Sequence, residues 1–319
     1  MRGVVFVLLA AVCFGTTGTA QALGPDASAT SLGAVRIVIG GGALALVAWL
    51  TMLASPKPHH TRTRRRGPAW PIVVAGAAGI VAYQPAFFFG TAENGVAIGT
   101  VVALGSAPVI TGALDWALNR RYPGTPWLIA TAIAAVGVAL LGGVLEAGAS
   151  GISPAGLAGS IGAGASYAVY TLAGKALLER GWGADASMGA VFGGAALASL
   201  PILLFSDLAW LGTPEGLLMA LWLGLITTTL GYVLFGRGLA TLSAPTVSTL
   251  TLAEPLTASL LALLVLNEQL SASGVAGFIV LAAALVVLSA ASVRRPAGRV
   301  EPSLADQSGA PSKQPDAVD

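Results

Sequence analysis

The chain has 319 residues, of which 55% are hydrophobic and 9% charged, and its formal net charge is +2. With a mean hydropathy of +0.81, it has too few charged side chains to cover a water-soluble globule of this length, which excludes a soluble protein. The small net charge gives no reason to expect nucleic acid as a partner. The composition therefore indicates a protein that lies in a lipid bilayer.

Apolar stretches of about 20 residues fill the chain, and each is long enough to cross a hydrocarbon core of about 30 Å as a helix. We predict ten spans, at residues 3–22, 32–54, 70–90, 94–118, 127–145, 154–177, 187–205, 216–236, 244–266 and 273–292. The first stretch also fits a cleaved signal peptide, because Arg2 precedes it and small residues near Ala22 end it. The expected fold class is an all-α polytopic membrane protein with ten transmembrane helices.

The charged residues between the spans alternate in sign along the chain. Positive charges occupy the N-terminus, every second connection and the tail, at Arg2, Lys57, Arg62, Arg64, Arg65, Arg66, Arg120, Arg121, Arg180, Arg237, Arg294, Arg295, Arg299 and Lys313. The other connections carry acids, at Asp26, Glu93, Glu146, Asp207, Glu215 and Glu268. The positive-inside rule then predicts an inner (plasma) membrane protein with both termini in the cytoplasm.

Two halves of the chain repeat the same features about 150 residues apart. Pro108 and Pro255 lie inside the fourth and ninth spans, and the segments 24–28 and 183–187 share the pattern Gly-x-Asp-Ala-Ser with one variable residue. We predict one repeat at 1–146, a second at 153–292 and a disordered cytoplasmic tail at 293–319. Because each repeat has five helices, the second enters the membrane from the opposite side, which is the inverted-repeat plan of many secondary transporters.

Residues 226–289 resemble the C-terminal signature of the EamA-type family of drug/metabolite transporters. The resemblance rests on Gly231-Tyr232 in the eighth span, Glu254-Pro255 in the ninth, the acidic Glu268 after it and a tenth span of small residues. It implies a carrier that exports small metabolites such as amino acids, or amphipathic compounds, through a cavity among helices one, three, four, six, eight and nine. One departure is Arg121, which stands in the first repeat where the second has Glu268.

The two prolines and one acid point to a binding site at mid-membrane. A proline within a helix frees the carbonyl four residues earlier, here at Leu104 and Thr251, and an unsatisfied carbonyl must face protein or water. Glu254 is the acid that we place near a span centre, where a charge is costly. It either handles protons or substrate, or is a neutral acid with a structural hydrogen bond.

Arg36 lies near the external end of the second span, where it snorkels to the interface, pairs with an external acid or binds a substrate carboxylate. Polar residues on the other cavity helices complete the candidate set for binding a small-molecule substrate. The full set is Thr17, Gln21, Arg36, Tyr83, Gln84, Pro108, Tyr167, Tyr170, Thr228, Tyr232, Thr251, Glu254 and Pro255.

The chain lacks the residues that an intramembrane enzyme would need. An intramembrane enzyme would need a catalytic cluster in the bilayer, yet the two histidines, His59 and His60, fall in a loop, and the single Cys13 has no histidine near it. We therefore expect neither catalytic residues nor a cofactor or metal ion. A passive channel and a membrane scaffold stay open as alternatives to a carrier, and the oligomeric state leaves no mark on the sequence.

Overall fold

The computed structural model describes residues 1–54, 67–144 and 152–294. Predictions that concern the basic loop at 55–66, Glu146 and the tail from 295 lie outside the described residues. Within them the chain forms helices joined by short turns and no strand. The longer elements are α1 (Arg2–Leu23), α2 (Ala29–Ala54), α3 (Trp70–Asn119), α4 (Thr125–Leu141), α6 (Pro154–Glu179), α7 (Ala184–Leu204) and α12 (Ala272–Arg294).

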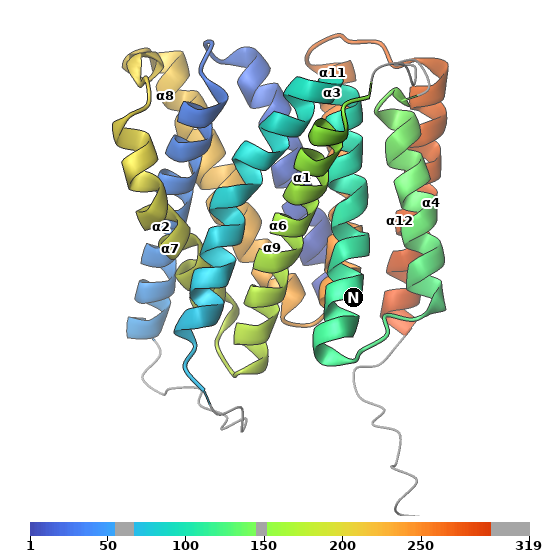
Figure 1. Cartoon of the computed structure of the whole chain (residues 1–319), viewed down its shortest axis with the longest axis horizontal. Coiled ribbons are helices and arrows are strands. Elements are labelled where there is room, and N and C mark those ends of the chain that lie inside the picture. The colour runs from blue at the N-terminus through green and yellow to red at the C-terminus, as the bar shows by residue number, and fades with distance from the viewer. Residues whose placement is uncertain (55–66, 145–151, 295–319) are drawn as a thin grey trace, which may run out of the picture.

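Seven helical stretches of the described chain are apolar and long enough to cross a membrane, and α4 is a shorter apolar helix. The predicted all-α, multi-pass membrane fold is thereby confirmed in its coarse form. The helices stand roughly side by side as a bundle (Figure 1).

Helix α3 holds two of the predicted spans in one run of 50 residues. A straight helix of that length would extend about 75 Å, well beyond a hydrocarbon core of about 30 Å. Gly95 breaks the run with φ 78° and ψ 158°, a conformation that glycine adopts without steric cost. The chain therefore reverses there, and α3 forms two limbs, 70–94 and 96–119 (Figure 1).

Two further spans consist of shorter helices in line. The eighth predicted span comprises α8 (Pro214–Leu221), the π-helix η2 (Trp222–Leu230) and α9 (Gly231–Leu239). The ninth comprises α10 (Ala244–Leu250) and α11 (Ala253–Leu264), which separate at Thr251 and Leu252. A short 3-10 helix, η1 (Ala209–Gly212), precedes α8.

The π-helix departs from the regular helix that hydropathy predicts. The Thr228 hydroxyl donates to the carbonyl of Leu223 at 2.9 Å, and the Thr229 hydroxyl donates to that of Gly224 at 3.0 Å, in both cases five residues earlier. Threonine hydroxyls compete in this way with the backbone ladder, and π segments often occur at functional sites.

Glycines allow the helices to approach closely. Between α3 and α6, a Cβ added at Gly79 would lie 2.9 Å from the carbonyl oxygen of Ser166, and one at Gly159 would lie 3.0 Å from the backbone nitrogen of Gly90. Between α4 and α12, a Cβ at Gly137 would lie 2.7 Å from the backbone nitrogen of Leu281. Small residues commonly line membrane helix contacts, because van der Waals packing rather than water exclusion holds such helices together.

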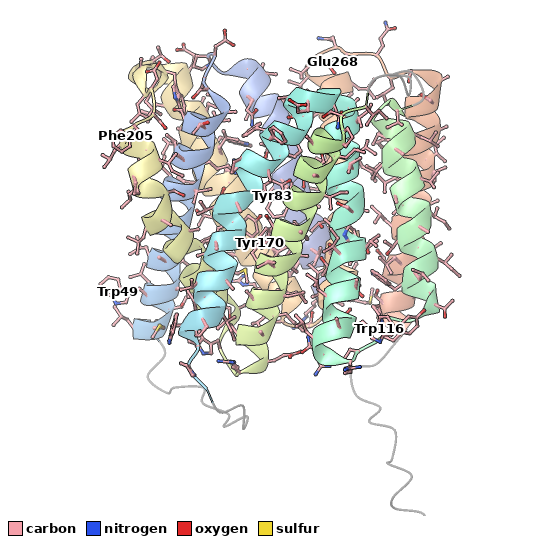
Figure 2. All side chains as sticks on the ribbon, in the orientation of Figure 1. Trp49, Tyr83, Trp116, Tyr170, Phe205 and Glu268 are labelled. Carbon is pink, nitrogen blue, oxygen red and sulfur yellow. The ribbon has the colours of Figure 1, made fainter. Side chains whose placement is uncertain are left out.

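The two ends of the bundle carry opposite charges. The helix ends at Trp49 and Trp116 lie at one end of the bundle, and Phe205 and Glu268 lie at the other (Figure 2). We call the first the basic end, because the turns after α3 and α6 and the end of α9 there carry Arg120, Arg121, Arg180 and Arg237. We call the second the acidic end, because its turns and helix ends carry Asp26, Glu93, Asp207, Glu215 and Glu268.

Candidate functional site

A polar cavity of about 100 Å³ lies inside the bundle, at the level of Tyr83 and Tyr170 (Figure 2). Its walls come from α1, α2, both limbs of α3, α6, α7, η2, α9, α10 and α11 and from the turn between the last two. Helices α4 and α12 contribute no residue of the described chain to it. The lining residues are Phe14, Arg36, Ile37, Ile80, Tyr83, Gln84, Ala103, Leu104, Ala107, Tyr167, Tyr170, Phe192, Thr228, Tyr232, Ser248, Thr251, Leu252 and Glu254.

Nine of the thirteen candidate residues meet in this cavity, although they are spread over more than 200 positions of sequence. They are Arg36, Tyr83, Gln84, Tyr167, Tyr170, Thr228, Tyr232, Thr251 and Glu254. Helices six, eight and nine of the prediction are among the walls, as are both limbs of α3. Helices five and ten, which are not among the helices that the family resemblance places around the cavity, correspond to α4 and α12 and contribute no described residue to the lining.

The other four candidates lie outside the lining. On α1, Thr17 is half-buried and Gln21 is exposed. Pro108 is buried within α3, one residue beyond the lining residue Ala107. Pro255 is half-buried at the start of α11, next to Glu254.

The carbonyl that Pro255 frees has found a partner within its own chain segment. The Thr251 carbonyl accepts a hydrogen bond of 2.9 Å from the backbone nitrogen of Glu254, so it does not depend on the cavity for satisfaction. The break between α10 and α11 therefore positions side chains at the cavity rather than a bare backbone carbonyl.

Arg36 lines the cavity, where its side chain bonds to a residue of another helix. It lies seven residues into α2, about 10 Å from the helix start at 1.5 Å per residue. Its Nε donates to the Thr228 hydroxyl at 3.0 Å, which ties α2 to the π-helix. No other hydrogen bond and no ion pair of its guanidinium occurs among the described residues, although both Arg36 and Glu254 line the same cavity.

Most polar groups of the wall are bound to one another. The Tyr170 and Tyr232 hydroxyls lie 3.0 Å apart, and the Tyr167 hydroxyl lies 2.8 Å from that of Thr251. Rings of Phe14 and Phe192 pack against Tyr232, with centroids 4.9 Å and 4.0 Å away. This aromatic wall is thus a packed surface in which each tyrosine hydroxyl is bonded to another hydroxyl.

Four lining residues keep hydrogen-bonding capacity for a ligand. The side chains of Tyr83, Gln84 and Glu254 have no hydrogen-bond partner in the described part of the chain, and Arg36 has only Thr228. None of their atoms is sealed away from the cavity as a buried orphan. The polar atoms of these four side chains could form hydrogen bonds with a bound molecule.

Residue-type and spacing arguments missed several lining residues. Ser248 on α10, within 3.3 Å of the Thr111 hydroxyl of α3, is polar but had no neighbour in sequence to mark it. Phe14 and Phe192 lie in apolar runs where any large side chain looks like a lipid contact. Only the rotation of α1 and α7 against their neighbours points these rings inward.

On the basic side of the cavity, hydrogen bonds hold α10 against α4. The Trp127 indole of α4 donates to the carbonyl of Pro245 and to the hydroxyl of Thr249, both at 3.0 Å, and the hydroxyls of Thr131 and Thr249 lie 2.9 Å apart. Residues 244–252 are nearly all buried, whereas α11 has no buried residue. Arg121 and Glu179 also form an ion pair at this end.

This fold and its enclosed polar cavity define a multi-pass membrane transport protein. The EamA-like transporter family matches residues 1–143 and 154–290, once in each half. Over 288 residues the chain is 42% identical to "Uncharacterized transporter YwfM" of Bacillus subtilis (strain 168), covering 90% of this chain and 93% of the relative. The chain belongs to the EamA-like transporter family, as the resemblance of residues 226–289 indicates.

A solved crystal structure shares the fold. It superposes with a TM-score of 0.72 over 92% of this chain and 98% of the other, at 19% sequence identity. At that identity the likeness concerns the fold alone.

Proposed function

We propose that this family member is a ten-helix secondary carrier that moves small metabolites, such as amino acids or amphipathic compounds, by alternating access. The count of ten treats the two limbs of α3 as separate crossings, and α8–η2–α9 and α10–α11 as one crossing each. Together with α1, α2, α4, α6, α7 and α12, these crossings number ten. Export is the direction that the family resemblance favours.

The orientation follows from the charged ends. We place the basic end, with both termini, in the cytoplasm of a cell whose inner membrane holds the protein, because positive residues are retained on that side. The two repeats, within 1–146 and 153–292, are then inverted copies that meet at the cavity. In this arrangement the hydrogen bonds between α10 and α4 lie toward the cytoplasm, and α11, which has no buried residue, lies toward the outside.

One observation carries the proposal of a carrier. Two oppositely charged side chains, Arg36 and Glu254, face one cavity from the first and second halves of the chain. Charged residues deep in membrane helices are costly and mark substrate or ion pathways. A cavity between two repeats is what a carrier needs to bind a solute from one side and release it to the other.

Comparing metabolites in the medium of cells that overexpress or lack the protein identifies candidate solutes, and proteoliposomes then test each for counterflow. We expect trans-stimulation, in which unlabelled solute inside accelerates uptake of labelled solute. Flux without trans-stimulation would indicate a channel, and no flux of any solute would refute transport. Repeating uptake with an imposed pH gradient tests whether protons, carried by Glu254, are coupled to the solute.

A further inference from the structure

Two ionisable side chains of opposite type, Arg36 and Glu254, line the cavity without forming a direct ion pair. The ion pairs within the described ranges are Arg121 with Glu179 and Arg237 with Asp185, both at the basic end. Charged groups inside a membrane protein are normally paired or bound to backbone groups. Here each keeps its capacity for a further partner.

The guanidinium is already oriented for such a partner. Its Nε is held by the Thr228 hydroxyl at 3.0 Å, and Thr228 is itself fixed because its hydroxyl bonds to the Leu223 carbonyl. The two terminal nitrogens of Arg36 remain, and they form the fork that binds a carboxylate or similar anion through two parallel hydrogen bonds.

The carboxyl group of Glu254 lies in the other repeat and accepts no hydrogen bond from any residue that the structure describes. The start of its helix is held in place by the preceding turn. In that turn the Thr251 hydroxyl lies 2.8 Å from the Tyr167 hydroxyl of α6. A protonated amine of a ligand can donate to the Glu254 carboxyl group. Tyr83, also without a hydrogen-bond partner in the described chain, lines the same cavity, and its ring stacks on that of Phe87.

The rest of the lining suits a compact, uncharged body. Ile37, Ile80, Ala103, Leu104 and Leu252 are apolar, and the tyrosine hydroxyls of the aromatic wall are bound to neighbouring hydroxyls. A molecule with one charge would leave either Arg36 or Glu254 without a partner in a poorly solvated site, which is costly.

We propose that Arg36 and Glu254 together select a zwitterion, with its anionic group on the Arg36 fork and its cationic group on Glu254, and that they reject analogues that lack either charge. This assignment rests on the proposed carrier function and names the chemistry that its site recognises. It makes the two residues specificity determinants with separate tasks, one from each repeat.

Binding to the purified full chain tests the proposal with ligand triplets. Each triplet consists of a zwitterion, a carboxylate and an amine that share one carbon skeleton. One triplet is L-leucine, 4-methylpentanoate and 3-methylbutylamine, a second is L-phenylalanine, 3-phenylpropanoate and 2-phenylethylamine, and further triplets extend the range of body size. In at least one triplet we expect the zwitterion to bind about tenfold to a hundredfold more tightly than either analogue, the usual cost of losing one charge-assisted contact.

Two substitutions separate the tasks. In Arg36→Gln we expect the amine to bind as tightly as the zwitterion, and in Glu254→Gln we expect the carboxylate to do so, while the zwitterion weakens by about tenfold to a hundredfold in each. Arg237→Gln and Glu268→Gln, which remove the same charges outside the cavity, should leave the ranking of the unmodified protein. If a glutamine variant does not fold, Arg36→Lys and Glu254→Asp keep the charge and should keep the ranking with weaker binding.

The outcomes distinguish this inference from the carrier function. A singly charged or neutral compound that binds as well as its zwitterion, a panel in which no zwitterion binds, or glutamine variants that leave the ranking unchanged would overturn the inference. Counterflow of such a singly charged or neutral compound would leave the carrier function standing. Tight binding of a zwitterion without counterflow would support the selection by charge and refute the carrier.

Discussion

Thr249 on α10 joins α10 to α4 on the basic side of the cavity. Its hydroxyl bonds to the Trp127 indole and to the Thr131 hydroxyl of α4, at 3.0 and 2.9 Å. Replacing it with valine keeps the shape and removes both bonds between helices. If α10 must separate from α4 to open the cavity to the cytoplasm, Thr249→Val destabilises the closed arrangement relative to the open one.

The size of the effect follows from the partners left behind. The Trp127 indole keeps its bond to the Pro245 carbonyl, whereas Thr131, which is 1% exposed, loses the one partner seen for its hydroxyl in the described chain. Hydrogen bonds between membrane helices contribute about 0.6 kcal/mol on average, and an unsatisfied buried hydroxyl costs about 1 to 3 kcal/mol. We therefore expect a shift of about 1 to 3 kcal/mol, or about fivefold to 150-fold in the equilibrium toward cytoplasmic opening.

Cysteine labelling measures this equilibrium. Because Cys13 is the only cysteine, Cys13→Ala gives a background without thiols, and Ala107→Cys then places one thiol in the cavity wall. With a membrane-impermeant maleimide, Thr249→Val should accelerate labelling at residue 107 about fivefold or more in inside-out vesicles, and it should not accelerate it in right-side-out vesicles.

The matched control is Thr257→Val on α11, where the one bond of the hydroxyl among the described residues goes to the Ala253 carbonyl of its own helix, at 3.2 Å. It should leave the labelling rate within about twofold of the background, because a local bond of about 1 kcal/mol or less does not join two helices. An unchanged rate in Thr249→Val, or an equal rise in both variants, would refute α10 as the cytoplasmic closure.

Three further substitutions test packing and charge, each by unfolding in detergent. Gly277→Ala should lower the free energy of unfolding by about 1 to 3 kcal/mol, because the new methyl would meet the backbone of α4, and an unchanged stability would contradict that contact. Tyr170→Phe removes the bond to the Tyr232 hydroxyl and should cost about 1 kcal/mol, with the ring packing retained. Arg121→Gln should cost less than about 1 kcal/mol, because the Arg121 side chain is 58% exposed beside Glu179; a larger loss would show that this surface pair is structural.

Sequence alone determined where the chain crosses between the two ends of the bundle. Hydropathy and charge are local properties of each stretch of chain, and they decide which stretch enters the hydrocarbon core and which turn stays on the cytoplasmic side. The approximate helix ranges and the alternation of basic and acidic turns therefore follow from them. The fold class was predictable on this basis, and the family was predictable from the motifs around Tyr232 and Glu254. Even the reversal between the third and fourth spans was located to within a few residues of Gly95.

Tertiary structure alone decided which side chains share the cavity. Arg36 is bound to Thr228 inside the cavity because α2 packs against a π-helix, whose altered pitch depends on threonine hydroxyl bonds that hydropathy does not record. Phe192 and Ser248 line the cavity, and Thr17 and Gln21 do not, because packing against neighbours far away in sequence sets the rotation of each helix. Helix rotation arises from packing between helices, so it is encoded in pairs of residues and not in any one stretch of chain.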